Sequence, residues 1–410
     1  MLWSKTAVSQ NDISIDGYYK NFSVVYDLPD YMKYFGFSEQ DIIGAVSNKL
    51  RLNLFYNPKN CLSFVLNYNI SSLVQDPALF KSQPLNVGIN PYSYRFADID
   101  SRLYPSEIDT DQSLGLFQNL DRANISISSN FCDVFIGRQA IAWGSARVIN
   151  PTDVIAPYTF EELDTEDRIG VDAVRMRIPI GFMGEFDAGY VAGDDFKFDK
   201  SAVFLRGKFY TKETDFSLLL LGFRENLLAG LDVTRSIGGA GFWCEAAYVF
   251  VKALTDDDTR EDENGYLRGT IGLDYNFGSK TYGFIEYHYN QAGSDKPGDY
   301  VSNFSKTAFI DGSVYLLGKH YLVPGLTYQF RPLIILNEQA LFNITDQSMF
   351  LSTHIEYNIS ENIYLAAGAY LGIGEHLKLL FPDELMPYTE YHSEFGAYPN
   401  IYFSSFRVYF

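Results

Sequence analysis

Histidines paired with carboxylates are the first residues of this chain that could do chemistry. Glu286 and His288 stand two positions apart, as do His354 and Glu356, and such a pair could hold a proton or a metal ion. Hydrolysis would also require a nucleophile within reach of its base. The five histidines have no HxxxH or HExxH spacing, and the sequence contains no CxxCH stretch and no glycine-rich phosphate loop. We therefore expect no catalytic residue, no metal, no cofactor and no enzyme activity.

Charged residues at alternate positions of apolar segments form a second set, and their chemistry is that of an electric field. Arg175, for example, stands between Val174 and Met176. In a strand this spacing puts charges on one face and apolar side chains on the other. The candidates for the charged face are Arg51, Arg175, Arg177, Glu185, Asp187, Arg206, Lys208, Glu245, Arg268, Asp274 and Glu286. They could line a pore and select its ions, or they could pair across strands and brace a wall.

Strands with this alternation are expected along the whole chain. At its end Phe406, Val408 and Phe410 fall on one face, whereas Ser405 and Arg407 fall on the other. The pattern predicts eighteen strands, or sixteen if one hairpin is miscounted. The expected ranges are 13–26, 43–56, 61–70, 117–128, 131–141, 170–180, 185–192, 200–211, 215–224, 227–235, 241–252, 265–277, 281–290, 314–330, 333–343, 348–359, 363–373 and 399–410.

The connections between these strands alternate in length. They are short after even-numbered strands, as at Pro58–Asn60 and Arg331–Pro332, and several are long after odd-numbered ones, as at 71–116 and 142–169. Short turns on one rim and long loops on the other are typical of an all-β, transmembrane antiparallel β-barrel of the bacterial outer membrane with periplasmic termini. We expect residues 1–12 to be an N-terminal periplasmic extension and 13–410 to form the barrel.

Composition agrees with a barrel and excludes other classes. Aromatic residues make up 16% of the chain, with 31 Tyr and 33 Phe, which suits the aromatic girdles of a membrane barrel. Mean hydropathy is -0.10, and the sequence has no apolar run approaching the length of a membrane-spanning helix. The formal net charge of -19 would repel backbone phosphates, so nucleic acid is excluded as a partner.

One segment resembles a known family. Residues 137–144 read Gly-Arg-Gln-Ala-Ile-Ala-Trp-Gly, and Asn150-Pro151-Thr152-Asp153 follows. This stretch is similar to the GRQ-x3-WG and NP-x-D pattern of Gram-negative outer-membrane barrels of the porin superfamily, some of them encoded beside exporters of the resistance-nodulation-division type. The segment begins where a strand is expected to leave the membrane and enter a long loop.

Two arrangements of that long loop remain open. Segment 142–169 could fold into the pore as a constriction, or it could form an outward rim packed on a neighbouring strand. The candidates for the constriction are Trp143, Asn150, Asp153, Glu161, Glu162 and Asp164. In the first arrangement the loop acids would face Arg51, Arg175, Arg177, Arg206 and Lys208.

The pattern favours a porin for passive diffusion of small hydrophilic solutes. The alternatives are the outer-membrane barrel of an exporter-associated assembly and a sheath around a partner such as a multihaem cytochrome. Expected partners are outer-membrane lipid, lipopolysaccharide and small solutes, together with the barrel insertion machinery, which the resemblance implies reads Phe410 as an insertion signal. Whether the barrel forms a homotrimer or binds a partner protein stays open.

Overall fold

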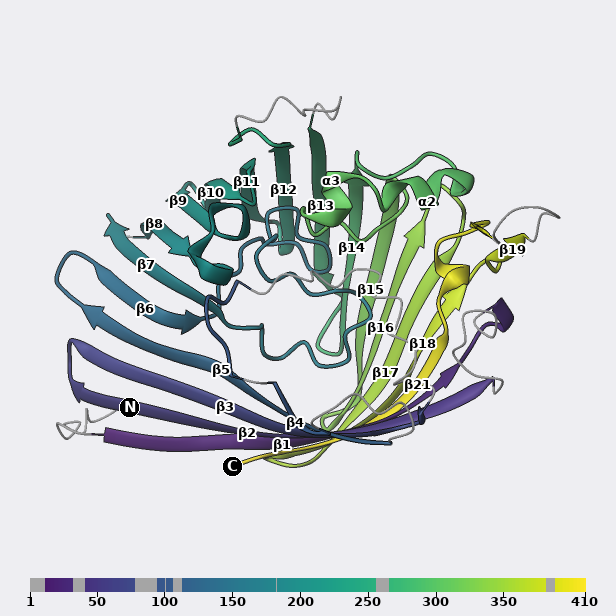
Figure 1. Ribbon diagram of the computed structural model, residues 1–410, viewed down its shortest axis with the longest axis horizontal. Coiled ribbons are helices and arrows are strands. Elements are labelled where there is room, and N and C mark those ends of the chain that lie inside the picture. The colour runs from purple at the N-terminus through teal and green to yellow at the C-terminus, as the bar shows by residue number, and fades with distance from the viewer. Residues whose placement is uncertain are drawn as a thin grey trace.

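The chain folds into one closed barrel of eighteen antiparallel strands, seen along an oblique axis in Figure 1. The computed structural model describes residues 12–31, 41–77, 94–99, 101–105, 113–181, 183–255, 265–380 and 388–410. Residues 1–11 of the expected periplasmic extension lie outside these ranges, and residue 12 lies within them. The fold class predicted from the sequence is confirmed, with eighteen rather than sixteen strands.

The barrel strands are β1 (Asp12–Asp27), β2 (Ile42–Lys59), β3 (Leu62–Gln75), β5 (Leu114–Ser128), β6 (Asp133–Gln139), β7 (Val171–Ile180), β8 (Gly184–Val191), β9 (Ala202–Thr211), β10 (Thr214–Phe223), β11 (Asn226–Ile237), β12 (Ala240–Phe250), β13 (Tyr266–Asn276), β14 (Thr281–Asn290), β15 (His320–Arg331), β16 (Ile334–Asn343), β17 (Met349–Ser360), β18 (Ile363–Ile373) and β21 (Asn400–Tyr409). β4 (Arg102–Tyr104) pairs with β5 alone, and β19 (Lys378–Leu380) pairs with β20 (Tyr388–Glu390). The barrel closes where β1 pairs with both β2 and β21.

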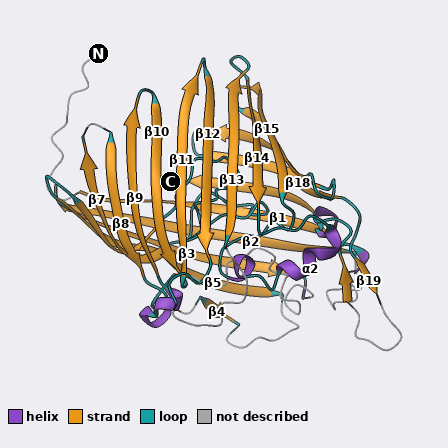
Figure 2. Cartoon of the chain, turned by 90° about the horizontal axis from the view of Figure 1, so that it is seen from above, coloured by secondary structure: helices purple, strands orange, loops and turns teal. Residues whose placement is uncertain are grey.

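The two rims differ as the loop lengths predict. On one rim the turns are tight, as at Lys212–Glu213, where both residues have positive φ and join β9 to β10 in a two-residue hairpin. The longer connections leave the other rim and carry the short helices α2 (Tyr300–Asn303) and α3 (Thr307–Ile310) (Figure 2). Asp12 pairs with Asn57 and Tyr409 with Tyr18, so both ends of the barrel sequence lie toward the tight-turn rim.

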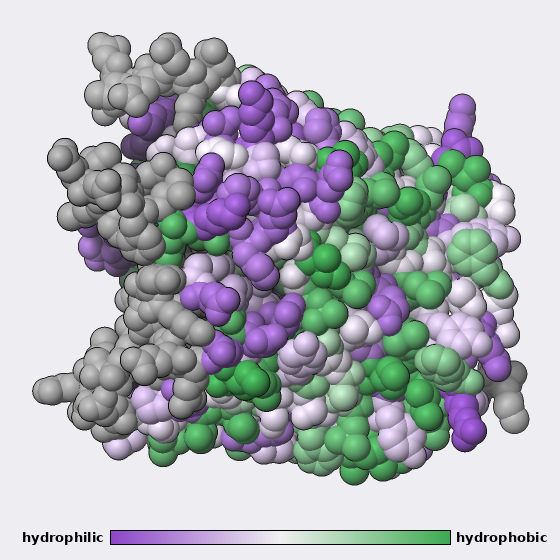
Figure 3. Space-filling model, turned by 90° about the vertical axis from the view of Figure 1, so that its right-hand side faces the viewer, coloured by the Kyte–Doolittle hydropathy of each residue, from purple (hydrophilic) through white to green (hydrophobic). Residues whose placement is uncertain are grey.

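Side chains alternate between an apolar outer face and a charged inner face. On β9, Val203 and Leu205 are 47% and 46% exposed, whereas Phe204 between them is fully buried. On β7 the outward Val174 is exposed and the neighbouring Arg175 is buried inside the barrel. Green apolar side chains dominate the outer wall on the tight-turn side of Figure 3. Among the described residues, no helix is long and apolar enough to cross a membrane.

Two expected strands are longer than the observed strands by four or more residues. The strand expected at 314–330 begins only at His320. Val314 to Leu317 belong to the connection between β14 and β15, and because all four are buried they show no period-2 contrast. The strand expected at 131–141 is only the seven residues of β6. Gly137 has φ +112°, and a Cβ there would lie 2.2 Å from the Ala123 carbonyl oxygen, so the sheet is tight and irregular at this point.

Phe410 ends the chain beside β1, and its role as an insertion signal is a prediction. Its backbone N–H and carbonyl exchange hydrogen bonds of 3.0 and 2.9 Å with Gly17, and the residue is 57% exposed. Phe410→Ala keeps these backbone bonds and removes only the ring from the tight-turn girdle. We expect a several-fold lower level in the membrane at low expression but an unchanged melting temperature of the folded protein. Tyr402→Ala is the matched control, and equal membrane levels of the two variants would count against the signal.

Candidate functional site

The connection between β6 and β7, residues 140–170, enters the barrel and is called the inner loop below. Figure 1 shows it as a blue thread that crosses the barrel opening. Its contacts reach β12, β13 and β14 on one side of the barrel and β1 and β2 on the other. Of the two arrangements left open by the sequence, the loop adopts the inward one.

Two acids of the wall hold the first half of the inner loop by its backbone. Glu245 on β12 accepts hydrogen bonds from the Thr152 N–H at 2.8 Å, the Thr152 hydroxyl at 2.7 Å and the Ser145 N–H at 3.1 Å. Glu286 on β14 accepts from the Val148 N–H at 3.1 Å and from the Trp243 indole at 2.8 Å. Both carboxylates are buried, so their bonds to the loop act at low dielectric.

Glycine is required where the loop passes these acids. Gly144 has φ +107°, and a Cβ there would lie 2.3 Å from Asn150 Oδ1 and 2.7 Å from Glu245 Oε2. Asn150 also accepts the Asp153 N–H through its backbone carbonyl at 3.2 Å. The Trp-Gly and Asn-Pro-x-Asp pattern therefore encodes a turn that fits against Glu245.

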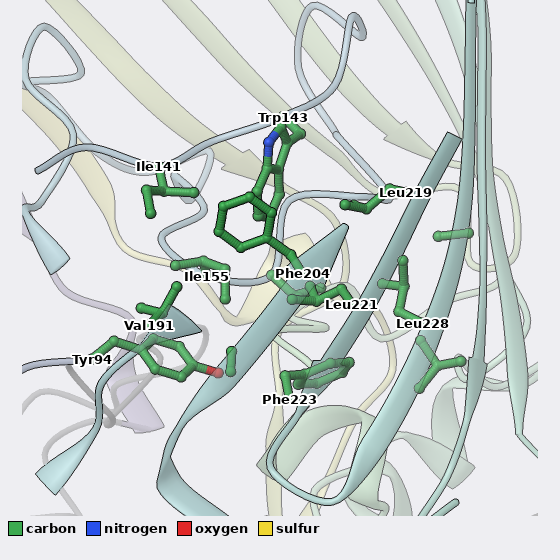
Figure 4. Close-up of a cluster of buried hydrophobic side chains, with 14 of the residues drawn as sticks. Tyr94, Ile141, Trp143, Ile155, Val191, Phe204, Leu219, Leu221, Phe223 and Leu228 are labelled. Carbon is green, nitrogen blue, oxygen red and sulfur yellow. The ribbon is translucent and has the colours of Figure 1, made fainter. Parts of the chain in front are cut away.

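Apolar packing fixes the same half of the loop. Trp143 is buried, and its ring meets Phe204 of β9 edge to face with centroids 4.8 Å apart. Ile141 and Ile155 pack beside it against Val191, Leu219 and Leu221 of the wall (Figure 4). Trp143 thus anchors the loop in an apolar cluster.

The motif arginine closes a gap in the wall. β6 pairs with β5 only along Ala123–Ser128, and β4 pairs with β5 only at Leu116 and Phe117. Residues 118–122 of β5 therefore have no strand neighbour on the side of β6. Arg138 donates to both carboxylate oxygens of Asp172, at 2.8 and 3.1 Å, and to Asp98 at 2.8 Å. It therefore ties segment 94–99 to β6 and β7 across this gap.

The acidic second half of the loop meets a basic strip on β1 and β2. Asp164 lies 2.7 Å from Lys20 and 3.1 Å from Lys49, and Glu166 lies 2.7 Å from Lys20. Asp167 lies 3.3 Å from Arg51, which also pairs with Asp121 at 2.8 Å. Opposed charges from loop and wall are thus in contact.

Four of the five basic residues expected to face the loop acids interact with other residues of the barrel wall instead. Arg175 forms a two-bond pair with Asp187 of β8, at 2.8 and 2.5 Å. Arg177 lies over the Phe135 ring, Arg206 donates to Ser217 at 3.4 Å, and Lys208 is 3.7 Å from Asp215. Glu185 is the cross-strand neighbour of Lys208. These charges brace the wall. The loop is instead contacted by Lys20 and Lys49, which were not among the partners predicted from the sequence.

A luminal cavity of about 690 Å³ lies between the loop and strands β13, β16, β17, β18, β21 and β1. Its walls carry Arg268, His354, Arg407 and Glu356, and the loop contributes Arg147, Asn150, Asp153, Glu162 and Asp164. Arg147 pairs with Asp274 at 2.6 Å, whereas the Nε and Nη1 of the buried Arg268 have no partner among the described residues. The cavity is polar and carries both signs of charge.

Two loop acids titrate near neutrality. Burial raises the pKa of Asp153 to about 6, although the adjacent Arg168 and Arg268 oppose this. Burial, with Glu162 next in sequence, raises the pKa of Glu161 to about 7. The charge of the loop therefore changes between mildly acidic and neutral pH.

The histidines of both His–Glu pairs, His288 and His354, are hydrogen-bonded to other residues of the barrel wall. His288 is buried with its Nδ1 2.8 Å from the Thr270 hydroxyl, and His354 Nε2 lies 3.2 Å from Asn337. No group of three or more His, Cys, Asp or Glu residues that could hold a metal ion occurs within the described ranges. Glu286, the neighbour of His288, is used to hold the inner loop.

Comparisons place the fold among solved barrels. No family model and no curated protein matches the chain. OccAB2 from Acinetobacter baumannii aligns with a TM-score of 0.58 at 7% identity, over 97% of this chain and 98% of that one. OccAB3 from the same organism aligns at 0.56 and 11% identity, over 97% and 99%. The outer membrane protein opdK from Pseudomonas aeruginosa aligns at 0.55 and 8% identity, over 97% and 98%. At such identities the likeness shows the fold, which is that of a closed eighteen-stranded barrel.

Proposed function

We propose that this protein is a bacterial outer-membrane porin through which small hydrophilic solutes diffuse. Its support is a closed barrel whose outer face is apolar and whose inner face is charged, as a wall between lipid and water requires. Eighteen strands leave a lumen wide enough for water. A relative in fold, opdK, is an outer membrane protein.

The observation that carries the proposal is the polar luminal cavity beside the inner loop. The loop narrows the lumen without filling it, since about 690 Å³ stays open between loop and wall. In this proposal the inward charges predicted from the sequence line the path of the solute. Arg51 and Asp274 pair with residues of the inner loop, and Arg268 lines the cavity. Asn150, Asp153, Glu162 and Asp164 form the loop side of the constriction, and Trp143 anchors it.

A sheath around a partner chain is not favoured, because the chain's own inner loop occupies part of the lumen. An exporter-associated role has support only in the sequence resemblance. The solved barrels of similar fold and the structural use of His288 and Glu286 favour a channel over an enzyme.

Liposome swelling tests solute passage directly. Purified protein in liposomes should allow neutral sugars to enter at rates that fall as the sugar becomes larger, because in this proposal the inner loop narrows the lumen. Liposomes without protein are the control. Folded protein that gives no swelling with the smallest sugar would contradict a diffusion channel.

Ion selectivity should depend on pH through Asp153. Its raised pKa means that the carboxyl becomes neutral as the pH falls below about 6, which leaves Arg168 and Arg268 less compensated. We expect the reversal potential under a salt gradient to shift toward anions between pH 7 and pH 5. Asp153→Asn should already show the shifted value at pH 7 and a smaller further change, part of which belongs to Glu161. A selectivity independent of pH in both proteins would oppose this assignment.

A further inference from the structure

A buried carboxyl group joins separate parts of the chain at the long-connection rim. Glu394 lies in the connection between β18 and β21, residues 374–399, and is fully buried. Its Oε1 accepts the Leu317 N–H of the β14–β15 connection at 2.8 Å. Its Oε2 accepts the Tyr321 hydroxyl of β15 at 2.5 Å and Asn343 Nδ2 of β16 at 2.7 Å. One side chain therefore links its own connection to a second connection and to two strands.

A second acid, Asp346 in the turn between β16 and β17, belongs to the same group. Its Oδ2 accepts the Glu394 backbone N–H at 2.7 Å, the Tyr300 hydroxyl of α2 at 2.9 Å and Asn343 Nδ2 at 3.1 Å. In Figure 1 the yellow connection that carries Glu394 lies beside α2, where the Tyr300 and Tyr391 ring centroids are 6.1 Å apart. We call this set the outer junction; its members are Glu394, Asp346, Asn343, Tyr321 and Tyr300.

The surroundings of Glu394 favour its neutral form. Its three hydrogen-bond donors are a backbone N–H, a phenol and a carboxamide, all of them neutral. Titratable side chains face it from each neighbouring element: Tyr300 of α2, Tyr321 of β15, Asp346 of the turn, Tyr391 and Tyr398 of its own connection and, beyond Tyr398, Glu161 of the inner loop. Phenols have an ordinary pKa of about 10 and stay neutral at physiological pH. An ionised Glu394 is therefore a buried charge held by dipoles alone, beside a second carboxylate.

The connection that carries Glu394 also contacts the inner loop through aromatic rings. The Phe160 ring of the inner loop has its centroid 5.6 Å from that of Phe395 and 5.4 Å from that of Tyr398. Its other ring partners are Tyr315 of the β14–β15 connection at 5.9 Å and Phe350 of β17 at 4.7 Å. We call these five residues the Phe160 cluster. Two of the four rings around Phe160 thus belong to the connection that Glu394 fastens.

The Phe160 cluster lies between the luminal cavity and the outer junction. Phe160 and Tyr315 line the cavity, whereas the other three rings of the cluster do not. Phe350 is the second residue of β17 and follows the turn that carries Asp346. Phe395 is fully buried and comes directly after Glu394. The cluster therefore covers the side of the cavity that faces the long connections.

We propose that Glu394 is a positioning residue of the passage: in its neutral form it holds the outer connections and the Phe160 cluster over the cavity, and in its ionised form it releases them. Ionisation places two carboxylates side by side, so Glu394 and its connection move toward water, where the charge is hydrated. Phe395 and Tyr398 move with the connection, and Phe160 loses two of its four ring partners. The way from the long-connection rim to the cavity then widens. The inference deepens the proposed function and rests on it.

The direction of the pH response follows from the burial of Glu394. Burial raises the pKa of Glu394 to about 8 in the closed arrangement; hydrogen bonds from Tyr321, Leu317 and Asn343 oppose this, and Asp346 adds to it. In water the same carboxyl group has a pKa of 4.5. The proton therefore stabilises the closed arrangement fully below about pH 4.5, and this stabilisation is lost as the pH rises through about 8. Within that window the ratio of open to closed protein rises up to about tenfold per pH unit.

Liposome swelling with neutral sugars at pH 5 and pH 8 tests this role, because uncharged solutes do not respond to ion selectivity. The quantity measured is the entry rate of the trisaccharide raffinose divided by that of arabinose. In wild type this ratio should rise several-fold from pH 5 to pH 8. Glu394→Gln keeps a neutral group of the same shape and should hold the low ratio at both pH values. Glu375→Gln, the same substitution at a 78% exposed side chain of the same connection, is the matched control and should respond like wild type.

Amide hydrogen exchange reports the outer junction without any solute. The Leu317 N–H donates to Glu394 and the Phe395 N–H donates to the Ser348 hydroxyl at 3.2 Å. After correction for intrinsic rates, both amides should exchange several-fold faster at pH 8 than at pH 5 in wild type, and equally fast in Glu394→Gln. A sugar ratio and exchange rates independent of pH in wild type, or a pH response that persists in Glu394→Gln, would overturn the proposal. Swelling with no sugar at either pH would contradict the proposed function, and the exchange rates would then still decide whether Glu394 controls the junction.

Discussion

Leu52→Arg should prevent efficient assembly of the barrel, whereas Asn53→Arg should assemble normally. Leu52 is 44% exposed on the outer face of β2, so an arginine there would place its charge in lipid at a cost of up to about 2–4 kcal/mol. Asn53 faces the lumen, where its amide donates to Asp16 at 2.8 Å, and an arginine could pair with that carboxylate.

Heat-modifiable migration and the yield of folded protein in the membrane measure this difference. Because the two positions are adjacent on β2, the two variants differ mainly in the face of the strand on which the arginine stands. Equal folded yields would mean that the outer face of β2 does not contact lipid, and the inside–outside assignment of the strand would be wrong.

Glu245→Ala should enlarge the channel by releasing the inner loop. Glu245 accepts four hydrogen bonds from Ser145, Ala146 and Thr152, and bonds to a charged acceptor contribute about 1.5–3 kcal/mol each. Losing them removes most of the polar anchoring at β12, although Glu286 and the Trp143 packing remain. We expect single-channel conductance to rise several-fold and to become noisier, because the loop then spends part of its time away from the wall.

Glu185→Ala is the matched control for this variant. Glu185 is also an inward acid, on β8, but its cross-strand neighbour is Lys208 of the wall. Its loss should leave conductance within a small factor of wild type. If Glu245→Ala conducted like wild type, Glu245 would not control the passage.

The strands and their two faces could be predicted because a β-strand repeats every two residues. The alternation assigns Leu50 and Leu52 to the outer face and Arg51 to the inner face. In the structure the two leucines are exposed and Arg51 is buried. Alternation fails where both sides of a segment are covered, as at Val314 to Leu317, which were expected to begin a strand.

Partners of the inner loop could be predicted only in part. The loop acids were expected against basic residues, but their contacts include Lys20 and Lys49, while Arg175 is used by Asp187. The inward position of Lys20 could have been predicted, since it alternates with the inward Tyr18 and Phe22. The path of the long loop could not, because it depends on packing such as that of Trp143 on Phe204. No local sequence pattern encodes that path.

Single-channel recording of the purified wild-type protein in a planar lipid bilayer tests whether the barrel conducts. We expect discrete current steps in potassium chloride, with a conductance that Glu245→Ala increases and Glu185→Ala does not. Folded, membrane-inserted protein that passes no current, in wild type and in Glu245→Ala alike, would contradict a solute channel.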